Sequence, residues 1–128
     1  MLKYHNPDTV AQPTVNYSLG VEVPAGARLL VTAGQIARNP DGTIAEGIEA
    51  QVERTLQNLL EVLDAAGMGP ENLVKMTTYL VDRAHGPVFR EVRDRMIGAP
   101  APAETMIVIA GLARTEMLIE IEAIAAAA

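Results

Sequence analysis

Acidic side chains near the end of the chain are the first residues whose spacing suggests chemistry. Glu120 and Glu122 stand two positions apart in an apolar stretch, so on a strand they share one face. Glu104 lies beside another predicted strand, and we expect the three carboxylates to crowd one acidic pocket. Like charges at close range raise the pKa of at least one carboxyl group, which creates a proton donor near neutral pH. The pattern indicates acid–base chemistry; the alternative is a set of rim carboxylates that solvate a sheet edge.

The residues that the chain lacks exclude several other mechanisms. It contains no cysteine, which rules out a thiolate nucleophile, a disulfide framework and a Cys-based metal site. His5 and His85 lie far apart and match no zinc-binding spacing. The formal net charge of −6 argues against nucleic-acid binding, because that affinity comes largely from basic residues. We therefore expect no metal, no cofactor and no nucleic-acid partner.

A local cluster of arginines could be mistaken for a binding surface. Arg90, Arg93 and Arg95 are interleaved with Glu91 and Asp94. Alternating charges at this spacing are typical of a solvent-exposed helix face with paired charges, and we interpret the cluster in that way.

The composition is that of one ordinary globular domain. The chain has 128 residues, of which 49% are hydrophobic and 20% charged, and we predict a single domain over residues 1–128. The polar N-terminus does not resemble a signal peptide, and no apolar run approaches the ~18 residues of a membrane span. We therefore expect a cytoplasmic protein without membrane association.

The elements that must position the acidic residues follow from the apolar periodicity. Steps of three or four predict a helix from about Ile48 to Ala66 and a second helix from an Asp82 cap to Gly98. Alternation and turn signals predict strands, which cover residues 17–23, 28–36, 72–81, about 105–110 and about 117–125, after an extended arm over residues 1–16.

This order, ββ-α-β-α-ββ, predicts an α+β fold in which two helices pack on one face of a mixed sheet. Ile119 and Ile121 are expected to lie under the helices. The opposite sheet face is partly apolar as well, which suggests burial against another subunit.

Several segments in this order resemble the Rid (reactive intermediate deaminase) family, also called YjgF-like and formerly labelled endoribonuclease L-PSP. The resemblance extends over residues 13–125. The matching stretches are Tyr17-Ser18 with Gly20-Val21, Val31-Thr32-Ala33-Gly34-Gln35-Ile36, Gln51 through Asn58-Leu59 to Ala65-Ala66-Gly67, Leu73-Val74-Lys75-Met76-Thr77-Thr78-Tyr79-Leu80, Pro100-Ala101-Pro102-Ala103 and Ile119-Glu120-Ile121-Glu122-Ala123-Ile124-Ala125.

The resemblance implies a chorismate-mutase-like α+β fold and a homotrimer with a central barrel of sheets and ligand clefts between subunits. It also implies cofactor-free hydrolysis of small enamines and imines, such as 2-aminoacrylate, to ketoacids and ammonia. Glu120 matches the position that holds a water near the reacting carbon, while Glu122 is expected to be structural. Tyr17 matches a cleft hydroxyl, with a core or interface tyrosine as the alternative. The segment implied to line the cleft comprises Thr32, Ala33 and Gly34, where Gly34 allows close backbone approach; a bulge glycine is the alternative.

Glu104 departs from the family pattern. In deaminating members an arginine after Pro-Ala pairs with the substrate carboxylate, a role that suits the two parallel donors of a guanidinium. A glutamate here reverses the charge, so we predict poor 2-aminoacrylate deamination and expect Glu104→Arg to shift activity toward imino acids. Two alternatives stay open: Glu104 faces solvent at a strand edge, or Arg114 or Arg28 replaces the anchor.

The resemblance therefore implies a small-molecule enzyme acting on an enamine, an imine or a related reactive carbonyl metabolite. The alternative is a non-catalytic trimer that binds a metabolite in the intersubunit cleft. A ribonuclease ranks last, because the chain is acidic, poor in aromatic residues and without a histidine pair for acid–base cleavage.

Overall fold

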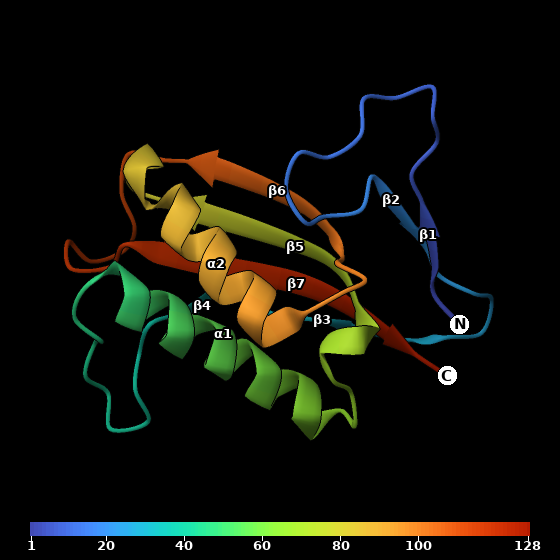
Figure 1. Cartoon of the computed structure of the whole chain (residues 1–128). Helices are drawn as coiled ribbons and strands as arrows, with labels where there is room; N and C mark the ends of the chain where they lie inside the picture. Colours follow the sequence, from blue (N-terminus) through green and yellow to red (C-terminus); the bar gives the residue numbers. More distant parts are fainter.

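The computed structural model describes residues 1–128 and confirms an α+β fold. Figure 1 shows both helices on the same side of the sheet. The helices are α1 (Ile48–Ala65) and α2 (Gly86–Ile97). The strands are β1 (Lys3–His5), β2 (Gly20–Glu22), β3 (Arg28–Val31), β4 (Gln35–Ile36), β5 (Leu73–Leu80), β6 (Ala103–Val108) and β7 (Ile119–Ala127).

Strand β7 is the centre of the main sheet, whose order is β3-β7-β5-β6 with β4 also paired to β7. It runs antiparallel to β3, β4 and β5, whereas β5 and β6 are parallel. In this register Glu120 lies opposite Tyr79 on one side and Ile36 on the other. The sheet is therefore mixed, as the sequence predicts.

The two faces of β7 differ as its alternating sequence requires. Ile119, Ile121 and Ala123 join the core under the helices and are at most 3% exposed. Glu120 and Glu122 lie on the opposite face and are half-buried. The expected burial of the two isoleucines is confirmed.

Helix α1 buries one apolar stripe, formed by Val52, Leu56, Leu59 and Leu63, each 0% exposed. It ends at a turn in which Gly67 has a φ of 69°, a conformation that favours glycine. Helix α2 starts later than expected, because Asp82 caps the short 3-10 turn Arg83–His85 instead. Neither helix is long and apolar enough to cross a membrane.

The N-terminal half differs from the expected strands in two ways. The arm contains β1, which pairs with β2 in a separate two-stranded sheet. The predicted strand 28–36 is interrupted at residues 32–34, between β3 and β4. There the Thr32 hydroxyl accepts the N–H of Ala123 at 3.0 Å, so a side chain takes the place of a backbone acceptor.

Leu59→Ala should lower the free energy of unfolding by about 2–5 kcal/mol, because it leaves a cavity between α1 and the sheet. Chemical denaturation measures this change. Leu60→Ala, at the partly exposed neighbouring position, is the matched control and should cost clearly less. Equal costs at the two positions would contradict the packing described here.

Candidate functional site

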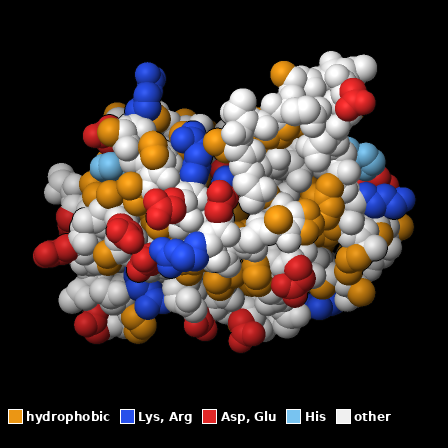
Figure 2. Space-filling view, in the orientation of Figure 1, with side chains coloured by type: hydrophobic (Ala, Val, Ile, Leu, Met, Phe, Trp, Pro, Cys, Tyr) orange, Lys and Arg blue, Asp and Glu red, His pale blue; other side chains and the backbone are white.

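The sheet face opposite the helices, here called the outer face, combines apolar and acidic side chains. Leu29 and Val31 of β3 are 63% and 71% exposed, and Ile124, the cross-strand partner of Val31, is exposed beside them. Ile107 of β6 is exposed at the opposite edge of the sheet. The helix side instead carries acidic and basic side chains intermixed with apolar ones (Figure 2). An apolar sheet face of this kind in a small protein is typical of an interaction surface.

Glu120 and Gly34 are brought together on the outer face. A side chain at position 34 would collide with the Glu120 carboxylate, whose Oε2, Cδ and Cγ occupy that space. Glycine at position 34 thus leaves room for the Glu120 carboxylate in this position, and a larger residue would require that carboxylate to shift. Two residues that the family resemblance singles out therefore form one local arrangement.

Thr32 and Ala33 hold the segment that leads to Gly34. The buried Thr32 hydroxyl donates to the Ala33 carbonyl at 2.9 Å and accepts from the Ala123 N–H. Both hydrogen-bonding functions of this hydroxyl are engaged with backbone, so it positions the segment. Ala33 itself is exposed.

Tyr79 is a site residue that sequence reasoning missed. Its hydroxyl donates to the Glu122 carboxylate, and Tyr79 is the cross-strand partner of Glu120. The hydrogen bond to Glu122 raises the pKa of Tyr79, with further contributions from burial and from both carboxylates. The available signal was the alternation Lys75, Thr77, Tyr79, which marks the polar face of β5.

The prediction that Glu104 shares an acidic pocket with Glu120 and Glu122 is wrong. Glu104 pairs in register with Met76, a fully buried core residue, so both point toward the helices. Its side chain is only 7% exposed and forms an ion pair with Arg93. The register of β5 and β6 places this carboxylate on the opposite side of the sheet, and the alternative of a solvent-facing Glu104 also fails.

The interpretation of the arginine cluster as wholly solvated is wrong for Arg93, whose side chain is 2% exposed. Its guanidinium also donates to Asp94 Oδ1 at 3.3 and 3.1 Å and lies 5.6 Å from the centre of the Phe89 ring. Arg93 follows Phe89 by one helical turn and so shares its inward face. Arg95, by contrast, makes an exposed ion pair with Glu53 at 3.0 Å.

The ion pair between Arg93 and Glu104 affects whether position 104 can bind a substrate carboxylate. Burial raises the pKa of Glu104, and the neighbouring Arg93 and Arg90 charges oppose this effect. Oε2 of Glu104 has no hydrogen-bond partner. An arginine at position 104 would remove this ion pair and put a second guanidinium beside buried Arg93, so the expected gain in imino-acid activity from Glu104→Arg depends on how Arg93 rearranges.

Neither proposed replacement anchor lies near Glu104. Arg28 donates to the carbonyls of Ala128 and Ala66, near the end of β7, and Arg114 pairs with Glu116.

Tyr17 lies beside the edge strand β6, whereas Glu120 lies on the central strand β7. The adjacent Ser18 bridges to Ala103 at the start of β6, and its hydroxyl donates to the Ala101 carbonyl at 2.6 Å. Strands β5 and β6 separate this edge from β7. Within one chain the predicted site residues thus form two groups: Glu120 with Gly34, and Tyr17 beside β6.

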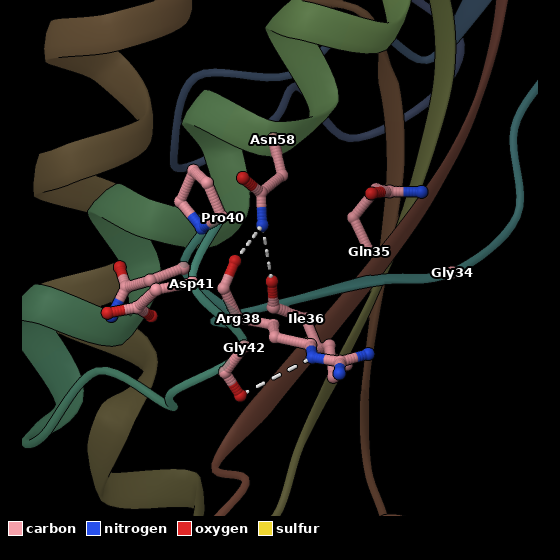
Figure 3. A pocket seen from close by; sticks show the side chains of 9 residues that line it. Gly34, Gln35, Ile36, Arg38, Pro40, Asp41, Gly42 and Asn58 are labelled. Atoms are coloured by element: carbon pink, nitrogen blue, oxygen red, sulfur yellow. Dashed lines mark hydrogen bonds between the residues drawn. The ribbon is translucent and has the colours of Figure 1, made fainter.

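A polar hollow of about 580 Å³ adjoins the first group (Figure 3). Asn58, from α1, donates to the carbonyls of Ile36 and Arg38, both at 2.9 Å, and so fixes the backbone of its floor. The hollow is lined by Gly34, Gln35, Ile36, Arg38, Asn39, Pro40, Asp41, Gly42 and Asn58.

Comparisons with known proteins agree with this fold. The family model described as endoribonuclease L-PSP matches residues 8–127. A RutC family protein of Pyrococcus abyssi is 33% identical over 116 residues, which cover 89% of this chain and 88% of the relative. The chain therefore belongs to the endoribonuclease L-PSP family, also called the YjgF or Rid family, and the resemblance inferred from its motifs is confirmed.

Solved structures place it within the same class. YyfB of Yersinia pestis, a conserved Rid family protein, matches with a TM-score of 0.88 at 35% identity, over 98% of both chains. A putative endoribonuclease of Thermotoga maritima matches with a TM-score of 0.75 at 31% identity, also over 98% of both chains.

The raised pKa of Glu104 predicts a pH dependence of stability. The folded state holds this proton more tightly than the unfolded state, so the contribution of Glu104 is complete below the ordinary carboxyl pKa of about 4.3. It is lost as the pH rises through the folded-state pKa. Unfolding free energies from pH 4 upward should therefore fall for the wild type relative to Glu104→Gln.

The control for simple charge removal is Glu53→Gln, which breaks only the exposed pair with Arg95. If the wild type gains stability relative to Glu104→Gln over that pH range, the attractive effect of Arg93 outweighs burial and the assigned direction is incorrect.

Proposed function

We propose that this protein hydrolyses a small enamine or imine to a carbonyl compound and ammonia, without a cofactor, at a cleft formed between the copies of a homotrimer. The observation that carries the proposal is the Glu120 carboxylate held against Gly34 on the outer face. Family membership supports the class of reaction, since a matching Rid structure covers 98% of the chain.

The exposed apolar side chains of the outer face support the proposed homotrimer. Burying the apolar side chains of β3, β6 and β7 against another copy would remove a patch that is costly in water. A second copy could also bring the edge with Tyr17 to the group around Glu120, which one chain keeps apart. A homotrimer accounts for both features.

In this proposal Glu120 accepts a proton from the attacking water. The new C–O bond forms as the C=N π electrons move to nitrogen. The Glu120 carboxyl group then returns its proton to that nitrogen, which gives a carbinolamine. Glu120 next takes the proton of the new hydroxyl group and passes it to the amino nitrogen, so the C–N bond breaks and ammonia leaves as the carbonyl forms. Tyr79 keeps Glu122 beside Glu120, and Tyr17 orients the ligand.

The surroundings of Glu104 support a substrate without a carboxylate beside the reacting carbon. Its carboxylate is buried and paired with Arg93, so position 104 offers no donor to a substrate carboxylate. A 2-imino acid, which carries its carboxylate directly beside the reacting carbon, loses the anchor that the family pattern implies. The same observation favours the second candidate function, a trimer that binds a metabolite in this cleft without turnover.

Glu120→Gln should lose on the order of a hundredfold or more in rate, because the amide keeps the shape but removes the base. Ammonia release from freshly generated imines measures the rate, and sedimentation verifies an unchanged assembly. The matched control is Glu91→Gln, at an exposed position on α2 away from the outer face. Wild-type turnover by Glu120→Gln would leave Glu120 as scaffold and put the binding function ahead.

Neutral imines should be turned over faster than 2-imino acids of similar size. An amine oxidase can supply the former and an amino acid oxidase the latter, with ammonia as the common readout. Each rate is corrected for spontaneous hydrolysis. A clear preference for the 2-imino acid would show that another group replaces the missing anchor.

A further inference from the structure

We infer that Arg38 forms a binding position for a small carboxylate, in the polar hollow that Gly34 and Asn58 also line. The inference deepens the proposed function, because it places the anionic end of the ligand at the β4 side of the sheet rather than at position 104.

Arg38 is an exposed residue whose guanidinium uses one of its donors within the chain. A guanidinium offers five N–H donors, and this one makes a single long hydrogen bond, from Nε to the Gly42 carbonyl at 3.4 Å. It takes part in no ion pair. Arg93, Arg95 and Arg114 are each paired with a carboxylate. Among the arginines without an ion pair, which also include Arg28, Arg54, Arg83 and Arg90, Arg38 is the one that lines this hollow.

The acidic residue nearest in sequence does not neutralise Arg38. Asp41 accepts from the Thr43 N–H at 2.9 Å and from the Thr43 hydroxyl at 2.6 Å. These hydrogen bonds lower the pKa of Asp41 and hold its carboxylate within the turn. The guanidinium therefore lines the hollow as an unpaired cation.

The surroundings of Arg38 are held in place. Asn58 donates to the Arg38 carbonyl, and Asn58 Oδ1 in turn accepts from Arg54 Nε at 3.0 Å. Figure 3 shows the Arg38 side chain directed away from Pro40 and Asp41, toward the side of Ile36 and Gln35. A rigid floor of this kind lowers the ordering cost of binding.

The position also suits the proposed reaction. Arg38 follows Ile36, the cross-strand partner of Glu120, by two residues, beyond the end of β4 and a bend at Ala37. A ligand anchored at Arg38 would thus carry its carboxylate at some distance from the carbon that faces Glu120. A carboxylate is favoured over a phosphate dianion because the hollow contains one cationic side chain in a chain of net charge −6.

The test is a titration of the ¹⁵N-labelled full chain with acetate, followed by the amide shifts of Gly34, Gln35 and Gly42. Acetate should give saturable shifts at these residues, and the isosteric neutral acetamide should not. Arg38→Gln should weaken acetate binding by roughly tenfold or more, the usual effect of losing a charge-assisted pair. Arg38→Lys should retain weaker binding, because it keeps the positive charge but lacks the two parallel donors of a guanidinium.

The matched control is Arg83→Gln, at an exposed arginine outside the hollow, which should bind acetate as the wild type does. Equal shifts with acetamide, or unchanged acetate binding in Arg38→Gln, would overturn the site. Tighter binding of inorganic phosphate would overturn the assignment to a carboxylate. The titration involves no turnover, so its failure and a failure of the hydrolase proposal are distinguishable.

Discussion

The structure depends on which side chains of strand β7 face the helices and which face outward. Its side chains alternate between the helix-covered core and the outer face, and a slip of one residue would exchange the two sets. Ile119 and Ile121 are 0% exposed, and burying each stabilises the fold by about 1.5–3 kcal/mol. Because β7 pairs with three other strands, this burial fixes the whole sheet register and keeps Glu120 on the outer face.

The same register explains why Glu104 cannot act with Glu120. Through Met76 of β5, the β6 residue Glu104 is aligned with Ala123 of β7, and all three point into the helix-covered side. A carboxylate buried there needs a partner, and Arg93 supplies one from α2. In this chain position 104 thus joins a helix to the sheet, where the family pattern has a ligand anchor.

The sequence predicted the parts of the structure that depend on local periodicity. The stripe from Ile48 to Ala66 and the alternation of residues 119–123 each follow from nearest neighbours along the chain, and both predictions held. Glu104 and Tyr79 were misjudged or missed because their surroundings are set by pairing between strands distant in sequence. Arg93 was misjudged because a charge normally marks solvent, whereas here a distant carboxylate makes its burial tolerable.

We propose that the site is completed by a second copy of the chain. The absence of native cysteine allows a direct measurement, the crosslinking of Ala33→Cys and Asn16→Cys chains by a short bis-maleimide after the two variants are mixed and reassembled. These positions adjoin Gly34 and Tyr17, one in each group of site residues. A site shared between two copies predicts a crosslinked pair containing one chain of each variant, at a yield above that of either variant alone. If mixing yields no such hybrid pair while the assembly stays intact, the two groups do not meet between copies, and the claim is contradicted.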